Sequence, residues 1–277
     1  MVNKYLKKIY LKLPNKYKKL IRKNYINFHW LTWVPQNTIN SLYWLYLKDK
    51  KINNINRFEK RIYSQNGEDG IIRAIFYKIK TTNKFCVEFG TEDGYECNTR
   101  YLIKKSGWKF LHMDGGENLP NSIKREFITA ENINDLFKKY EVPKEFDLLS
   151  IDIDFNDYFV WKAIKDYNPR VVIIEYNSSI PPTESKVIRY EAKRRSDGTN
   201  YFGASLLALS KLGKTKGYTL VACDSKGINA FFIRDDLILN QFEVKNVQKT
   251  FRAPKYGFKI NGKYIGNPPS NESMITI

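Results

Sequence analysis

Three acidic residues lie at a glycine turn, and their spacing suggests a site for a cationic ligand. The apolar run Phe85–Phe89 contains Glu88 and is followed by Gly90-Thr91-Glu92-Asp93-Gly94. A dinucleotide site needs a second glycine and an uncharged turn, so that backbone N–H groups can approach a pyrophosphate. Three carboxylates would repel a pyrophosphate but attract a cation. S-adenosylmethionine, with a sulfonium and an ammonium group against one carboxylate, therefore fits this turn better than NAD.

The elements around the turn indicate a nucleotide-binding α/β unit. A helix is expected from Asn98 to Ser106, and an apolar strand from Trp108 to Met113. Strand, glycine turn, helix and strand form the first unit of such a sheet. Asp114 ends the second strand, about where a ribose-binding carboxylate is expected. A tight turn in a sheet protein that binds another ligand is the alternative interpretation.

The rest of the chain predicts an α/β fold with a Rossmann-like, seven-stranded, mostly parallel sheet that ends in an antiparallel hairpin. Strands alternating with helical segments favour parallel crossovers, and two adjacent strands joined by a short turn favour a hairpin. The remaining expected strands are 126–129, 146–151, 170–174, 218–223 and 229–233, with helices at 71–79, 133–140, 158–164 and 206–212.

Two segments outside these elements suggest binding functions. In the polar cluster Tyr63–Gly70, Ser64 can cap the following helix, but capping does not explain Gln65, which could close over a bound nucleotide. The segment from Ser178 to Asn200 shows no core periodicity and contains several arginines and prolines. Loops of this length are usually lids or binding elements.

Positive charge is concentrated in residues 1–57. The 277-residue chain has a formal net charge of +18, and residues 1–57 hold thirteen Lys or Arg against Asp49 alone, a surplus of +12. Lysines interleaved with large aromatic groups are typical of helices on an anionic membrane surface. A helical subdomain packed on the main domain is an equally weighted alternative. Nucleic acid is not favoured as a partner, because no RNP, zinc-finger or helix-turn-helix pattern accompanies the charge.

The cysteines and apolar runs favour a cytoplasmic protein, with the inner membrane face as the place where residues 1–57 could attach. Three cysteines without a C-x-x-C spacing and only two histidines argue against a zinc site. No apolar run has the length of a membrane span, and no signal-peptide pattern is present. We expect a basic helical extension at 1–57, a catalytic domain at 58–240 and a basic tail at 241–277.

An ordered set of motifs between about Tyr63 and Arg234 resembles the FkbM-like S-adenosylmethionine-dependent methyltransferases. The motifs are Gln65–Asp69, Val87–Thr99, Gly107-Trp108, Ser150–Asp154 with Asn156-Asp157-Tyr158, and Glu175-Tyr176-Asn177. The resemblance implies a Rossmann-like sheet and methyl transfer, typically to oxygen on sugars or natural products. It does not cover residues 1–57. Phe155 stands where the pattern Asp-x-Asp-Gly-Asn-Asp has glycine, and this departure predicts an altered loop near the acceptor.

The residues and the resemblance together predict a cofactor site. Glu88 and Gly90 shape the turn, and Asp114 takes the ribose hydroxyls. Glu131 and Asn132 flank the adenine, and Asp152 and Gln65 lie near the methionine end. The full predicted set is Gln65, Glu88, Gly90, Thr91, Asp93, Gly94, Asp114, Gly115, Glu131, Asn132 and Asp152.

Catalysis needs alignment of the acceptor with the sulfonium and a base that removes the hydroxyl proton. The candidate bases are sought after the expected strands 146–151 and 170–174, at the edge where open α/β sites lie. They are Asp154, Glu175 and, less favoured, His112. Asp154, Glu175 and Asn177 have three possible roles. They could hold Mg²⁺, or one carboxylate could act as the base without a metal, which is the role that we favour. In the third interpretation Asn177 only caps a turn. We expect an O-methyltransferase acting on a sugar, surface glycan or glycolipid precursor. The alternative is a non-catalytic membrane- or nucleic-acid-binding protein with this fold.

Overall fold

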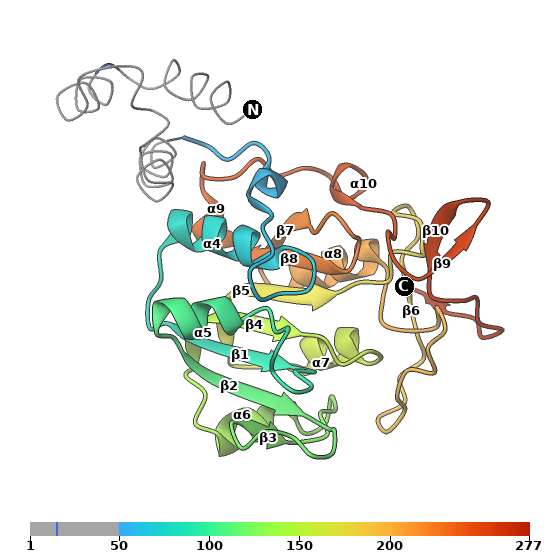
Figure 1. The fold of residues 1–277 in the computed structure, drawn as a ribbon, viewed down its shortest axis with the longest axis horizontal. Coiled ribbons are helices and arrows are strands. Elements are labelled where there is room, and N and C mark those ends of the chain that lie inside the picture. The colour runs from blue at the N-terminus through green and yellow to red at the C-terminus, as the bar shows by residue number, and fades with distance from the viewer. Residues whose placement is uncertain (1–14, 16–49) are drawn as a thin grey trace. The chain divides into compact units, whose positions relative to one another are not determined.

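The computed structural model describes residue 15 and residues 50–277 (Figure 1). The chain divides into two compact units after Ile52, and the second unit, Asn53–Ile277, is the subject of all that follows. The basic helical extension predicted for residues 1–57 therefore lies almost wholly outside the described residues. Its last residues belong to the second unit, where the 3₁₀ helix η2 (Ile55–Phe58) packs against helix α4 (Glu68–Ile79).

A seven-stranded sheet forms the centre of the second unit. Its strand order is β3-β2-β1-β4-β5-β8-β7. Strands β3, β2, β1, β4 and β5 pair in parallel, whereas β8 pairs antiparallel with both β5 and β7. The predicted Rossmann-like fold with its terminal antiparallel hairpin is confirmed. The strands are β1 (Phe85–Phe89), β2 (Lys109–Asp114), β3 (Ile123–Arg125), β4 (Glu145–Ile151), β5 (Asn168–Glu175), β7 (Tyr218–Cys223) and β8 (Asn229–Arg234).

Helices cover the sheet and build its core. The largest apolar cluster joins one face of β1, β2, β4 and β5 to helices α6 (Ile133–Lys139), α7 (Asp157–Ala163) and α8 (Leu206–Thr215). Helix α4 buries Ile71, Ile72 and Ile75, and helix α5 (Arg100–Ser106) follows the glycine turn. Strand β5 is central, and every residue from Pro169 to Ile174 is buried, as expected for a strand covered on both faces. None of the helices within residues 50–277 is long and apolar enough to cross a bilayer.

The third strand was predicted too late in the sequence. Strand β3 spans Ile123–Arg125 rather than 126–129, and it pairs with the last three residues of β2. Pairing stops because β2 ends at Asp114, whose carbonyl accepts the last bond from the Glu126 N–H. Residues 126–129 therefore leave the sheet at its carboxyl edge.

Two helix starts also differ from the prediction. Helix α5 begins at Arg100 instead of Asn98. Helix α4 has Gly67, with φ of 109°, as its N-cap rather than Ser64. Ser64 still serves the first turn, because its hydroxyl accepts a hydrogen bond from the Asp69 N–H at 3.1 Å.

Residues 241–277, expected as a basic C-terminal tail, lie within the second unit and form short elements. Strand β11 (Ile275–Thr276) pairs with β6 (Lys186–Val187), and strands β9 (Phe258–Ile260) and β10 (Lys263–Gly266) form a hairpin. The short helices α9 (Asp235–Ile238) and α10 (Val247–Thr250) connect these strands to the sheet. Strands of two to four residues are too short to show an apolar period, which explains why this segment could not be placed.

Candidate functional site

Two adjoining cavities lie at the carboxyl edge of the parallel strands. They share Gly90, Glu92, Asp114 and Asp154 as walls. We call the smaller one, of about 320 Å³, the Arg195 cavity, and the larger one, of about 490 Å³, the acidic cavity. The Arg195 cavity is also lined by Gly115, Gly116, Glu126, Phe127, Ile128, Ile153, Asn156, Arg194, Arg195 and Ser196. The acidic cavity is also lined by Gln65, Glu68, Glu88, Thr91, Asp93, Tyr95, Glu96, Cys97, Asn98, Asp152, Glu175, Ile228, Asn229, Tyr256 and Asn267.

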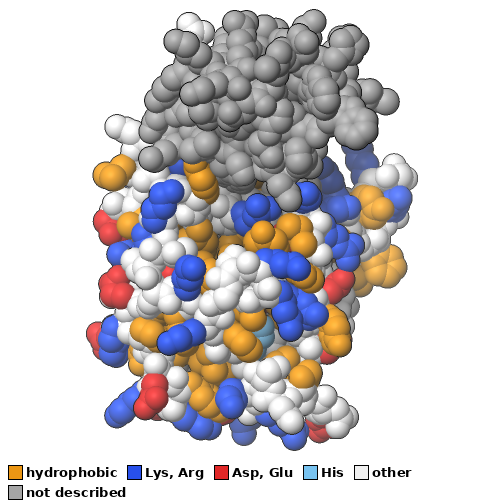
Figure 2. All heavy atoms as spheres, turned by 60° about the vertical axis from the view of Figure 1, so that its left-hand side comes forward, with side chains coloured by type: hydrophobic (Ala, Val, Ile, Leu, Met, Phe, Trp, Pro, Cys, Tyr) orange, Lys and Arg blue, Asp and Glu red, His pale blue; other side chains and the backbone are white. Residues whose placement is uncertain are grey.

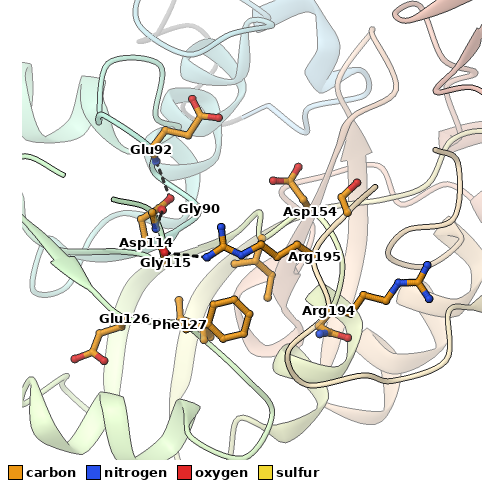
Figure 3. A pocket seen from close by; sticks show the side chains of 14 residues that line it. Gly90, Glu92, Asp114, Gly115, Glu126, Phe127, Asp154, Arg194 and Arg195 are labelled. Atoms are coloured by element: carbon orange, nitrogen blue, oxygen red, sulfur yellow. Dashed lines mark hydrogen bonds between the residues drawn. The ribbon is translucent and has the colours of Figure 1, made fainter. Parts of the chain in front are cut away.

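The glycine turn between the cavities depends on Gly90 and Asp114. Gly90 has φ of 66°, and a Cβ atom there would lie 1.4 Å from the carbonyl oxygen of Asp152, so only glycine fits. The Asp114 carboxylate accepts hydrogen bonds from the N–H groups of Glu92, at 2.8 Å, and Gly116, at 2.7 Å (Figure 3). Asp114 thereby fixes the loops that follow β1 and β2 while it lines both cavities.

Glu88 fixes the start of helix α5. Its carboxylate is buried and accepts hydrogen bonds from the Asn98 N–H at 2.8 Å, the Thr99 N–H at 2.9 Å and the Thr99 hydroxyl at 2.5 Å. These bonds use the N–H groups that precede Arg100, which explains why the helix begins later than predicted. Burial raises the pKa of Glu88, and the hydrogen bonds oppose that shift.

His112 lies beneath the site and lines neither cavity. Its Nε2 atom is 2.8 Å from the Thr99 hydroxyl oxygen. Because that hydroxyl donates its proton to Glu88, Nε2 must carry the proton of a neutral ring and donate it to Thr99. Burial lowers the pKa of His112 to about 4, with a smaller contribution from Arg100. The structure therefore does not bring His112 to a position where it could act as the base.

Three carboxylates, from Asp152, Asp154 and Glu175, converge in the acidic cavity. One oxygen of each lies within 4.8 Å of the others. Burial is the main cause that raises the pKa of all three. Asp157 adds to the shift of Asp152, Asp152 to that of Glu175, and Asp114 to that of Asp154. Oε2 of Glu175 has no hydrogen-bond partner among the described residues. A raised pKa makes a carboxylate a stronger proton acceptor than an ordinary carboxylate.

Asn177, predicted beside Asp154 and Glu175, does not join them. Its side chain is buried, donates to the carbonyls of Asn200 and Phe202 and accepts from the Ser179 N–H. Asn177 therefore ties the loop after β5 to residues 200–202, and Asp152 takes the third place in the cluster.

The cluster Tyr63–Gly70 forms one wall of the acidic cavity. The Asp69 carboxylate accepts from the N–H groups of Ile62, Tyr63 and Ser64 at 2.7–2.9 Å, which folds the segment back over the helix start. Gln65 lines the cavity in consequence. This placement accounts for Gln65, which helix capping left unexplained.

Besides Oε2 of Glu175 and the Tyr256 hydroxyl, three more buried polar atoms at the cavities have no hydrogen-bond partner within the described part of the chain. They are Oγ1 of Thr91 and Oδ1 of Asn229 at the acidic cavity, and Oδ1 of Asn156 at the Arg195 cavity. Each of these residues is less than a tenth exposed. Because buried polar atoms are normally paired, these three are available to a ligand.

Arginines of the loop 178–200 form the outer wall of the Arg195 cavity (Figure 3). Arg195 reaches across to donate to the Gly115 carbonyl at 3.0 Å, and its guanidinium lies 5.4 Å from the Phe127 ring centre. Arg194 points the other way, lying 5.0 Å from the ring centre of Phe155. Phe155, found where the resemblance expects glycine, is buried with Ile188, Tyr201 and Phe202. It anchors this loop beside the site.

Most of the predicted cofactor residues lie together. Gln65, Glu88, Gly90, Thr91, Asp93, Asp114 and Asp152 line the acidic cavity, and Gly115 lines the Arg195 cavity. Gly94 belongs to the turn but lines neither cavity. Glu131 and Asn132 also line neither. Glu131 accepts from the Tyr190 hydroxyl at 2.5 Å, and Asn132 bonds to residues 127 and 129. Glu126, Phe127 and Ile128 line the Arg195 cavity instead, because β3 ends earlier than predicted.

Sequence reasoning missed several residues of the walls. Glu68 and Asn229 hydrogen bond to each other at 3.0 Å across the acidic cavity, and Tyr256 and Asn267 close one of its sides. Glu68 could have been found, since it belongs to the same cluster as Gln65. Tyr256 and Asn267 carry no signal of their own in a segment without recognisable periodicity.

No family model matches the sequence, and no curated protein matches it. Among solved structures, the chain is similar to the CMeT domain of the citrinin polyketide synthase (10% identity, TM-score 0.37) over 62% of this chain and 54% of that one. It is also similar to a pericyclic reaction enzyme (14%, TM-score 0.36) and to LepI in complex with SAM (14%, TM-score 0.33), each over 75% of this chain and 54% of the other. The matches thus span about half the length of those chains. At these TM-scores the likenesses carry no weight for function, which has to be argued from the site.

Proposed function

We propose that the protein is an S-adenosylmethionine-dependent methyltransferase. The observation that carries this proposal is the charge of the acidic cavity, whose lining includes nine carboxylates and no lysine or arginine. The chain as a whole has a net charge of +18, and Figure 2 shows lysines and arginines spread over one face with few acids among them. Such a concentration of acids at the carboxyl edge of a Rossmann-like sheet favours a nucleoside ligand that is cationic rather than phosphorylated.

The chemistry of the two cavities suits the two parts of this cofactor. Asp114 lies between the cavities, where its carboxylate can accept hydrogen bonds from ribose hydroxyls. Phe127, Ile128 and Ile153 give the Arg195 cavity apolar surfaces suited to an adenine ring. The acidic cavity offers carboxylates to an ammonium and a sulfonium group, and Thr91 and Asn229 offer their unpaired oxygens. When bound, the cofactor supplies an electrophilic methyl group.

The carboxylates of Asp152, Asp154 and Glu175 would then act on the acceptor. Glu175 and Asp154 can accept the proton of an acceptor hydroxyl, and the remaining oxygens can hydrogen bond to neighbouring hydroxyls. A sugar, surface glycan or glycolipid precursor fits these needs, in line with the resemblance to FkbM-like enzymes. The same three residues are hard oxygen ligands and form the alternative, a Mg²⁺ site. We favour the metal-free site, which predicts that EDTA leaves activity unchanged.

Calorimetric titration with S-adenosylmethionine, its demethylated product and NADH tests the cofactor. We expect both sulfur-containing ligands to bind. We expect Asp114→Ala to weaken binding roughly 10-fold to 150-fold, because a hydrogen bond to a charged group contributes about 1.5–3 kcal/mol. Glu117→Ala, at an exposed acid three residues further on, is the matched control. Unchanged affinity in Asp114→Ala would remove Asp114 from the site, and tight NADH binding would overturn the cofactor.

Transfer of a labelled methyl group to cell-envelope glycan extracts tests the reaction. We expect Glu175→Gln and Asp154→Asn to abolish transfer while S-adenosylmethionine still binds. Full activity in both variants would refute the catalytic role of these carboxylates. Activity lost in EDTA and restored by Mg²⁺ would replace the metal-free site with the metal site.

A further inference from the structure

The β9–β10 hairpin is a well-specified element beside the acidic cavity. Its turn, Asn261-Gly262, has φ angles of 50° and 76°, as in the type I′ turns that favour Asn-Gly in two-residue hairpins. At its base Gly257 and Gly266 bridge, and a Cβ on Gly257 would lie 2.0 Å from the Gly266 carbonyl oxygen. The residues just outside this base, Tyr256 and Asn267, line the acidic cavity. The hairpin therefore extends directly from the cavity wall.

Both faces of the hairpin are exposed, although it contains large apolar side chains. Phe258, Ile260 and Tyr264 are 62%, 54% and 42% exposed, and every residue from Gly257 to Tyr264 is exposed. Figure 1 shows the hairpin projecting on the side to which strands β1 and β2 point. Phe258 and Ile260 lie on one face of the ribbon with Lys263, and Tyr264 lies on the other face with Lys259. A two-stranded ribbon is marginally stable at best in water, so large apolar groups exposed on both of its faces indicate an element that is covered by a partner.

The charge around the hairpin identifies the kind of surface that it fits. Residues 244–271 contain six lysines and arginines and no acid. Within the hairpin, the Lys259 ammonium lies 4.4 Å from the Tyr264 ring centre, and Lys263 lies opposite Ile260. Phenylalanine, isoleucine and tyrosine bracketed by lysines match the boundary of a bilayer, where apolar groups enter and lysines meet anionic headgroups.

We infer that the β9–β10 hairpin docks on an anionic membrane surface, with Phe258, Ile260 and Tyr264 in the headgroup region and the lysines on lipid phosphates. Docking there would bring the acidic cavity to the membrane, because Tyr256 and Asn267 belong to both the base of the hairpin and the cavity wall. Resting on the proposed function, this assigns the methyl acceptor to the lipid-linked class, such as a glycolipid precursor.

Dye labelling of the full chain at Ile260 tests the insertion directly. The three native cysteines are buried, so Ile260→Cys gives a selective site for an environment-sensitive maleimide dye. Leu239→Cys is the matched control, since Leu239 is 74% exposed and lies outside the hairpin. We expect vesicles of phosphatidylcholine with phosphatidylglycerol to blue-shift the dye at position 260 but not at 239, and phosphatidylcholine alone to shift neither.

Three outcomes would overturn the inference. The first is an unshifted dye at position 260. The second is an equal shift at both positions. The third is a shift that depends on protein concentration without vesicles, which would make a second copy of the chain the occupant. None of these readouts needs the cofactor, so their failure is distinct from a failure of S-adenosylmethionine to bind in calorimetry.

Vesicle sedimentation tests the lysines. We expect Lys259→Glu combined with Lys263→Glu to weaken binding to anionic vesicles at least twenty-fivefold, because each basic group near such a surface contributes about fivefold. Lys104→Glu combined with Lys105→Glu, in the last turn of α5, makes the same charge change elsewhere. An equal loss in both double variants would show that net charge alone governs binding and would refute docking through the hairpin.

Discussion

Asp157 beneath the site should make the protein less stable as the pH rises. Its side chain is 1% exposed. One carboxylate oxygen accepts the Ile153 N–H at 2.8 Å, and the other has no partner among residues 50–277. Burial raises the pKa of Asp157 to about 7 from an ordinary 3.8. The folded state therefore retains this proton where the unfolded chain has lost it. The contribution of Asp157 to stability therefore falls between about pH 4 and pH 7 and is constant above pH 7.

The substitution Asp157→Asn removes this titration and retains an oxygen for the Ile153 N–H. At about 1.4 kcal/mol per pH unit, Asp157 lowers the wild-type free energy of unfolding by about 3 kcal/mol between pH 5 and pH 8. We expect the variant to gain that amount relative to wild type over the same interval.

Urea unfolding of both proteins at pH 5 and pH 8 measures the difference. The matched control is Asp135→Asn, at an exposed acid in the first turn of α6. A difference between Asp157→Asn and wild type that is the same at both pH values would refute the argument. So would an equal pH-dependent gain in Asp135→Asn.

Three further substitutions test other contacts. Arg170→Met should lower the free energy of unfolding, measured by urea unfolding, by about 3–5 kcal/mol. The reason is that it leaves the buried Asp147 carboxylate without the guanidinium that lies 2.9 Å away. A loss below about 1 kcal/mol would contradict this. Gly90→Ala should abolish S-adenosylmethionine binding in calorimetry, since its Cβ would collide with a carbonyl oxygen, whereas Gly198→Ala, with φ of 77° but open space, should leave binding intact. Arg195→Ala should weaken binding of free adenosine roughly twofold to fivefold, because it removes the cation–π contact that holds Phe127 in the wall of the Arg195 cavity, and unchanged binding would show that this contact does not support the nucleoside.

The sheet and its acidic edge could be predicted because they follow from strong local patterns. Strand β5 contains the continuous β-branched run Val171–Ile174, and the glycine turn after β1 is marked by Gly90 and its acids. Parallel strands place their carboxyl ends at one edge. The meeting of Asp152, Asp154 and Glu175 therefore follows from topology, even though the sequence separates the first and last by more than twenty residues.

The remaining features depend on contacts that sequence patterns do not encode. His112 lies two residues before the end of β2, inside the sheet, where side-chain alternation turns it toward Thr99 instead of the edge. Asn177 is taken by carbonyls of residues 200 and 202, which come near only when the loop folds. Strand β3 was misplaced because three paired residues are too few for a period of two to be visible.

The order of the cavity walls along the chain has a consequence for biosynthesis. Strand β8, the last to join the central sheet in sequence order, ends at Arg234, whereas Tyr256 and Asn267 follow it. Translation proceeds from the N-terminus, so the seven strands are synthesised before the acidic cavity has its last two walls. A chain cleaved between Arg234 and Tyr256 would retain every strand of that sheet and the glycine turn. It would lose the side of the cavity from which the hairpin extends.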